Sequence, residues 1–250
     1  PERAGRVRAV RGGTIPLRDG AGTMTYISAH RDRTVGLFPI RDLNPTRVFP
    51  YVTLLLIVVN GLVYFFWQPH GGPDEAEFMY RHAAIACEVT TGHPLTADEY
   101  QLDVCRQDPV AEAFFPNKSI EVSVFVSMFL HGSLFHLLGN MWFLWLFGNN
   151  IEEAYGAIRF LVVYLLAGLL AAIGFIALNP DGLTPLIGAS GAIAGVLGSY
   201  LVLFPRRWVI SFVVITLLPI PAVVFLGLWF LMQFAVSDPG AVIVALGDLL

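Results

Sequence analysis

Charged side chains are scarce in this chain. Of its 250 residues only 14% are charged and 56% are hydrophobic, and the mean hydropathy is +0.66. A soluble domain carries about 25% charged and about 45–50% apolar residues. The composition therefore excludes an ordinary soluble domain and predicts a polytopic membrane protein. Residues 1–47 also lack the apolar core that a signal peptide requires.

Cysteine and histidine are scarce as well. The only two cysteines, Cys87 and Cys105, lie in residues 68–121, where a disulfide between them would suit an oxidising compartment. No histidine follows His136, so the apolar runs hold too few ligands for a zinc site. We expect no metal, no cofactor and no nucleic-acid partner, and the oligomeric state stays open.

The basic residues are distributed unevenly. Nine of the fifteen, all arginines, precede Thr53, so the positive-inside rule predicts a cytoplasmic N-terminus. The segment 68–121 holds ten acidic residues against three basic ones and is expected to be a long outward loop. We divide the chain into an Arg-rich cytoplasmic tail, 1–47, and a membrane domain, 48–250. The expected location is a bacterial inner membrane.

Several apolar runs are long enough to cross the hydrocarbon layer, which takes about 17–25 residues. There are five: 49–67, 122–147, 158–178, 185–204 and 221–236. The apolar stretch Trp208–Leu218 precedes two prolines and is expected to lie on the cytoplasmic face or to lengthen the fifth span. We predict an all-α polytopic bundle. We also expect a fragment cut at both ends, with a sixth span beyond Leu250.

Polar side chains interrupt the second apolar run, where ionisable groups are costly and often functional. His136 and Asn140 are four residues apart and share one helix face. On a continuous helix His131 would lie about 140° from His136. The alternative to a functional site is that these groups only hydrogen-bond neighbouring helices together.

Ser190 opens the fourth run within the motif Gly188-Ala189-Ser190-Gly191. It lies near an expected helix start after Pro185, where free backbone N–H groups can bind an oxyanion. The alternative is a packing helix whose glycines let a neighbouring helix approach closely. A nucleophilic serine needs a base, usually histidine, and His136 is a candidate.

Around these residues the chain resembles the rhomboid family of intramembrane serine proteases. The matching stretches are Phe129–Met141, Phe147-Gly148, Ile151-Glu152, Gly188–Ala192, Pro221–Gln233 and Phe38–Asn60. The resemblance implies that Ser190 is the nucleophile and that His136 and Asn140 complete an oxyanion hole with the Ser190 amide. It also implies that His131 holds the outer loop and that Glu152 caps or braces the cytoplasmic end of the second helix.

The family's general base, by the same resemblance, is a histidine on a sixth span, which this sequence does not contain. We therefore expect a truncated intramembrane endopeptidase that cuts single-span substrates in the lipid bilayer near their outer boundary. The alternative is an inactive rhomboid-like protein that binds transmembrane helices. A small-molecule or proton transporter would show inverted repeats, and the sequence has no convincing internal symmetry.

Overall fold

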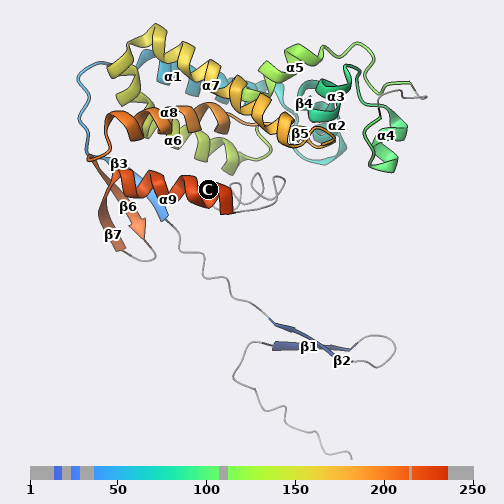
Figure 1. Cartoon of the computed structure of the whole chain (residues 1–250), viewed down its shortest axis with the longest axis horizontal. Coiled ribbons are helices and arrows are strands. Elements are labelled where there is room, and N and C mark those ends of the chain that lie inside the picture. The colour runs from blue at the N-terminus through green and yellow to red at the C-terminus, as the bar shows by residue number, and fades with distance from the viewer. Residues whose placement is uncertain (1–13, 19–23, 29–36, 107–111, 214–215, 236–250) are drawn as a thin grey trace, which may run out of the picture. The chain divides into compact units, whose positions relative to one another are not determined.

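The computed structural model describes residues 14–18, 24–28, 37–106, 112–213 and 216–235. The chain divides into two units, Pro1–Gly36 and Leu37–Leu250. In the first unit, β1 (Thr14–Arg18) pairs antiparallel with β2 (Met24–Ser28). All other elements belong to the second unit (Figure 1).

The second unit is mostly helical. Its larger helices are α1 (Tyr51–Leu62) with a π-helical turn (Val63–Trp67), α5 (Ile120–Val126) with a 3-10 turn (Ser127–Phe129), α6 (Leu134–Tyr155), α7 (Ala157–Leu178), α8 (Ser190–Leu203) and α9 (Ala222–Ala235). Helix α6 lies centrally and packs against α1, α7 and α8. Its Leu144, Phe147 and Ile151 are fully buried in the main hydrophobic cluster.

Helices α7 and α8 pack closely because small residues face each other. A Cβ atom added to Gly191 would collide with Ala171, and one added to Gly195 would collide with Ala167. Membrane helices associate by this kind of close backbone approach. Gly191 and Gly195 therefore serve helix packing, whatever chemistry Ser190 performs.

By length and composition, α7 is the one described helix that can cross a membrane unaided. A second span results if α5, its 3-10 turn and α6 count together, although they bend by 77°. Helices α1, α8 and α9 are apolar but shorter. The count of five spans thus stays a prediction.

The predicted continuous helix over 122–147 is wrong, because the chain is extended between the 3-10 turn and α6. Leu130 has ψ 145° and ends the first part. Ser133 has φ −160° and ψ 162°, and its hydroxyl accepts a hydrogen bond from the His136 amide. That bond is an N-cap, which starts a new helix at Leu134.

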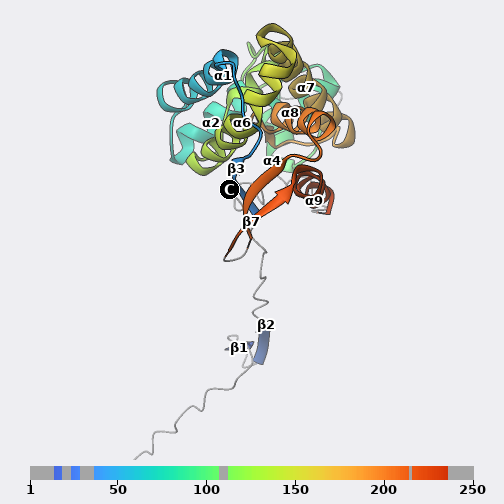
Figure 2. The ribbon, with the colours of Figure 1, turned by 90° about the vertical axis from the view of Figure 1, so that its left-hand side faces the viewer.

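The fold also contains a sheet that the all-α prediction missed. Strand β6 (Trp208–Val213) pairs antiparallel with β3 (Leu37–Asp42) and with β7 (Thr216–Pro221). Figures 1 and 2 show this sheet beside the start of α9. The stretch Trp208–Leu218 therefore does not extend the fifth span. The prolines of β7 are tolerated because this strand forms one edge of the sheet.

Strand β3 joins the sheet to the helices through Asp42. This carboxylate accepts hydrogen bonds from the Tyr200 hydroxyl of α8 at 2.7 Å and from the Asn150 amide of α6 at 2.6 Å. The indole of Trp142 donates to the Pro39 carbonyl at 2.7 Å. The segment before α1 is thus bonded to both α6 and α8.

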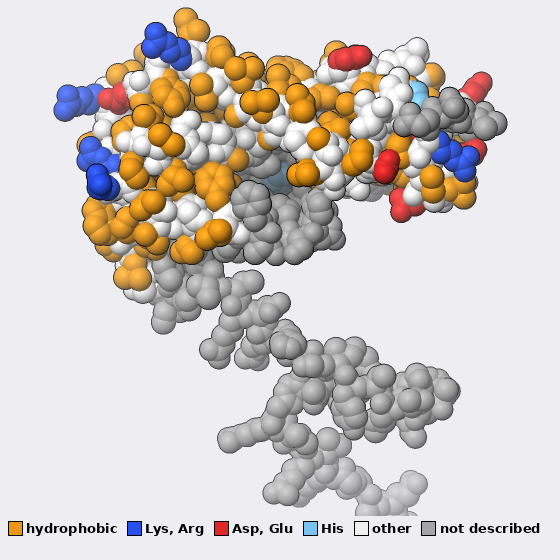
Figure 3. Space-filling view, viewed as in Figure 1, with side chains coloured by type: hydrophobic (Ala, Val, Ile, Leu, Met, Phe, Trp, Pro, Cys, Tyr) orange, Lys and Arg blue, Asp and Glu red, His pale blue; other side chains and the backbone are white. Residues whose placement is uncertain are grey.

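Residues 68–119, named here the connecting lobe, have secondary structure of their own. They contain α2 (Gly72–His82), β4 (Ala84–Ile85), α3 (Ala86–Thr91) and α4 (Ala97–Leu102). Strand β4 pairs with β5 (Pro185–Leu186), just before Ser190. Figure 3 shows hydrophobic side chains across the helical body, with acidic ones mainly at the lobe end and basic ones mainly at the other.

Candidate active site

Ser190 is the first residue of α8, so the N–H groups of its first turn have no partner within the helix. The preceding loop brings Gly188 against the imidazole of His136. A Cβ atom at Gly188 would lie 2.8 Å from Cε1 and 2.9 Å from Nε2 of that ring. Gly188 also has φ +112°, a conformation that favours glycine. Both the space and the backbone thus require glycine here.

Ser190, His136 and Asn140 line one small cavity. Its volume is about 20 Å³, enough for one water-sized group. The remaining lining residues are Gly139, Phe143, Ile193 and Trp229, so α6, α8 and α9 all contribute. His136 and Asn140 are only 7% and 5% exposed. The cavity is therefore a polar site enclosed mainly by apolar side chains.

The hydrogen bonds of the cavity leave donors available. The Asn140 amide nitrogen donates to the His136 carbonyl at 2.9 Å, which uses one of its two hydrogens. Within the described part of the chain, no hydrogen bond joins the Ser190 hydroxyl to His136 or Asn140. A group entering the cavity would meet the second amide hydrogen, the imidazole and the start of α8.

His131 lies in the extended segment just before α6 and is fully buried. The His131 and His136 ring centroids are 5.2 Å apart, with the rings edge to face. The sequence placed these histidines on one helix, pointing in different directions. The break brings them together, so His131 supports the wall of the cavity.

Gln68 and Ser127, which belong to no sequence motif, hold these loops. Gln68 bonds both backbone groups of His131, donating to its carbonyl at 2.9 Å and accepting from its amide at 3.0 Å. The Ser127 carbonyl accepts from the Gly188 amide at 2.9 Å, and its hydroxyl accepts from the Ala84 amide at 2.7 Å. In the sequence, the feature that could have indicated them is a polar residue directly after an apolar run, as for Gln68, or within one, as for Ser127.

Glu152 lies far from the cavity, in the last turn of α6. Its carboxylate accepts hydrogen bonds from the Val52 amide at 2.9 Å, the Thr53 amide at 2.7 Å and the Thr53 hydroxyl at 2.7 Å. These amides belong to the first turn of α1, where a negative charge is favourable. Glu152 thus caps α1 and joins it to α6.

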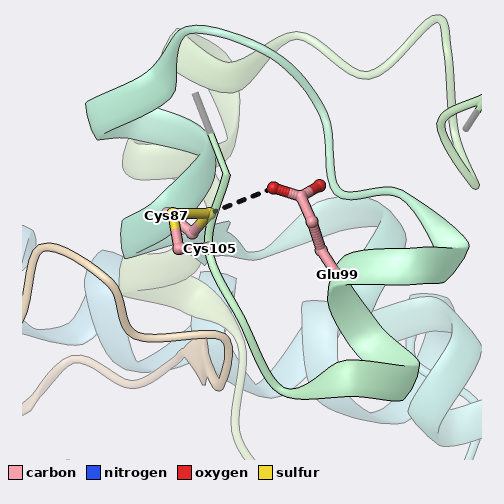
Figure 4. Close-up of side chains that lie close together, drawn as sticks. All are labelled: Cys87, Glu99 and Cys105. Atoms are coloured by element: carbon pink, nitrogen blue, oxygen red, sulfur yellow. Dashed lines mark hydrogen bonds between the residues drawn. A yellow bond between two sulfur atoms is a disulfide. The ribbon is translucent and has the colours of Figure 1, made fainter. Parts of the chain in front are cut away.

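A disulfide joins Cys87 and Cys105 in the connecting lobe, with the Glu99 carboxylate beside it (Figure 4). Glu99 Oε1 is 3.7 Å from Cys87 Sγ. A disulfide sulfur carries no hydrogen, so this is a contact and not a hydrogen bond. Burial raises the pKa of Glu99, but hydrogen bonds from Arg106 and Thr96 outweigh it and hold the pKa below its usual value. As a disulfide, the two sulfurs offer no thiolate to a metal.

The described fold and cavity define a helical-bundle protein with a serine-centred polar site. Residues 121–243 match the Rhomboid domain model, so this part of the chain is a rhomboid domain, and proteins of the rhomboid family are integral membrane proteins. No solved structure matches the chain.

Three relatives illustrate the similarity. Rhomboid protein 1, mitochondrial, of Saccharomyces cerevisiae is 34% identical over 113 residues, which are 44% of this chain and 30% of the relative. Rhomboid protease GluP of Bacillus subtilis is 43% identical over 72 residues, 29% of this chain and 14% of the relative. Presenilin-associated rhomboid-like protein, mitochondrial, of Homo sapiens is 39% identical over 85 residues, which are 32% of this chain and 22% of the relative.

The aligned stretches thus span less than a third of each of these relatives. Two of the three are mitochondrial proteins, so the comparison gives no support to the bacterial inner membrane that we expected. One relative is called a protease and another only rhomboid-like. Their names do not decide whether this chain is active.

Proposed function

We propose that this chain is an intramembrane serine endopeptidase that cleaves transmembrane proteins near the outer boundary of the membrane. The observation that carries the proposal is the shared cavity of Ser190, His136 and Asn140. His136 and Asn140 lie near the start of α6, and Ser190, 54 positions after His136, begins α8. A half-buried hydroxyl beside a buried imidazole and a buried amide on one cavity suits acyl transfer.

The proposed chemistry begins with attack of the Ser190 hydroxyl oxygen on the substrate carbonyl carbon, while the hydroxyl proton passes to a base. The carbonyl oxygen becomes an oxyanion and receives hydrogen bonds from the Ser190 amide, the free Asn140 hydrogen and the His136 imidazole. The base then protonates the leaving amine. Water releases the acyl group from Ser190 in a second, equivalent attack.

This mechanism requires a base, and His136 is already assigned to the oxyanion. One His136 nitrogen cannot donate to the oxyanion and also take the serine proton. Among the described residues, no other histidine lines the cavity. We therefore expect the polypeptide 1–250 to show no Ser190-dependent cleavage. Robust cleavage by that polypeptide would make His136 the base instead.

The second candidate function is binding of transmembrane helices without cleavage. The observation that favours it is that His136 is the one histidine among the described residues that line the cavity. The two candidates differ in the reactivity of Ser190. A base-activated serine reacts with a fluorophosphonate, whereas an unactivated serine does not.

The proposed disposition in the membrane is five crossings, with the connecting lobe outside and the Arg-rich N-terminus in the cytoplasm. It is supported by the charge separation in Figure 3 and by the arginines before Thr53. The cavity then lies at the outer ends of α6 and α8. Glu152 lies toward the cytoplasmic end, about 18 Å from Asn140 along α6.

The decisive experiment compares Ser190→Ala with Ser199→Ala in protein expressed from its complete gene. Ser199 is on the same helix and donates to the Gly195 carbonyl at 2.9 Å, but it does not line the cavity. We expect fluorophosphonate labelling and substrate cleavage in the wild type and in Ser199→Ala, and neither in Ser190→Ala. Equal labelling of all three would overturn the proposal. Helix binding without labelling in any form would favour the second candidate.

A further inference from the structure

A second cavity lies between the connecting lobe and α5, with no lining residue in common with the Ser190 cavity. Its volume is about 460 Å³, within the range of small-molecule sites, about 300–1,000 Å³. Three elements line it: the end of α2 with Arg81 and His82, the segment 114–119, and α5 with Val122, Ser123 and Val126. It is named here the lobe cleft.

The charge of the lobe cleft is opposite to that of its surroundings. Residues 68–121 contain ten acidic and three basic residues. Two of those three basic residues, Arg81 and Lys118, line the cleft, and its described lining contains no carboxylate. An anion is therefore the ligand that this part of the lobe favours.

The two cations differ in availability. The Lys118 side chain is 2% exposed and is paired with the equally buried Glu88, so its charge is already balanced. Arg81 is half exposed, and its one ion pair among the described residues is with the exposed Glu77, at 2.7 Å. Its guanidinium lies 4.8 Å from the centre of the Phe115 ring. Exposed ion pairs are weak, so an anion can replace Glu77 while Phe115 holds the guanidinium in place.

The other wall of the cleft is apolar. Val122 and Phe114 are 58% and 47% exposed. Val122 and Val126 lie on α5, which begins the apolar run that continues into α6. In an integral membrane protein this surface continues from the lobe to the lipid. The cleft thus joins an anion-binding end to an apolar end.

We propose that the lobe cleft binds an anionic phospholipid, with the headgroup phosphate on Arg81 and an acyl chain along Val122 and Val126. Arginine recognises phosphate by paired, charge-assisted hydrogen bonds. The proposal requires residence in a membrane and does not depend on proteolysis.

The test is native mass spectrometry of the full chain in detergent, titrated with phosphatidylglycerol or with phosphatidylcholine of the same acyl chains. We expect phosphatidylglycerol to bind about tenfold more tightly to the wild type. Arg81→Gln should abolish this preference. The matched control, Arg159→Gln, removes an exposed arginine of α7 that does not line the cleft, and should keep it. Glu77→Gln should tighten phosphatidylglycerol binding, because it removes the competing carboxylate.

Further arms separate a lipid from free phosphate and from the proposed protease. Val122→Gln should weaken lipid binding, and inorganic phosphate should compete poorly. Ser190→Ala should bind lipid as the wild type does. Equal binding of the two lipids, equal behaviour of Arg81→Gln and Arg159→Gln, or full competition by inorganic phosphate would each overturn the proposal.

Discussion

Asn140→Ala provides the sharpest test of the oxyanion assignment, because the chain contains a structural counterpart to Asn140. Asn140 donates to the carbonyl four residues earlier, that of His136, at 2.9 Å. Asn60 on α1 donates in the same way to the Leu56 carbonyl, at 2.7 Å. The residues are 5% and 0% exposed, respectively, and only Asn140 lines the Ser190 cavity.

The expected magnitudes follow from this difference. Each substitution loses one buried side-chain hydrogen bond, a net cost to stability of about 0.5–1.5 kcal/mol. Asn140→Ala also loses an oxyanion donor, which removes about 2.7–4 kcal/mol of transition-state stabilisation, or about 10²–10³ in kcat. Both variants should therefore lose a similar amount of stability, and only Asn140→Ala should lose most of its turnover.

The assay is cleavage of a model single-span substrate in liposomes by protein expressed from its complete gene, with kcat and KM determined separately. Thermal unfolding of the same preparations gives the stability term. A loss of turnover in Asn60→Ala equal to that in Asn140→Ala would refute the reasoning. So would an Asn140→Ala effect confined to KM, since that would place the side chain in substrate binding or packing.

Three further predictions concern other parts of the fold. Gly188→Ala should lower turnover about 10²–10³-fold by displacing the His136 ring, whereas Gly198→Ala on α8, where an added Cβ meets no atom within 4 Å, should leave turnover unchanged. Lys118→Met alone should destabilise the lobe by about 3–5 kcal/mol, because it leaves Glu88 buried without its cation. In thermal unfolding, the double variant Lys118→Met with Glu88→Gln should be more stable than Lys118→Met. Burial lowers the pKa of His93, but hydrogen bonds to carbonyls and nearby carboxylates outweigh it and raise the pKa above 6.5. His93 therefore stabilises the lobe fully below pH 6.5, and this contribution is lost as the pH rises through the raised pKa. Thermal unfolding as a function of pH should show this dependence in the wild type and not in His93→Gln.

The proximity of His136, Asn140 and Ser190 could be anticipated from the sequence, because polar residues at membrane depth tend to face one another inside a bundle. The position of His131 could not. The sequence predicts one helix that continues through Leu130–Ser133. In the structure, the chain is extended there, and an N-cap hydrogen bond to Ser133 starts a new helix. Apolar periodicity gives no sign of such a break when the residues on both sides are hydrophobic.

The sheet was missed for a related reason. In β6, the buried residues Val209 and Ser211 alternate with more exposed ones, as a strand requires. Most of the exposed residues are also apolar, so the sequence reads as one apolar run, which fits a helix equally well. The contact of Gln68 with His131 was likewise hidden, because the two are 63 positions apart.

The pairing of β3 with β6 has a consequence for synthesis of the protein. Leu37 pairs with Val213, so 176 positions separate the partners. Contacts that distant form late, since the intervening chain must be made and ordered before they can close. Strand β3 leaves the ribosome early and waits for β6 while the helices from α1 to α8 are added. The N-terminal strand thus pairs only after α8 and β6 have been made, and until then the sheet cannot hold Asp42 against Tyr200 and Asn150.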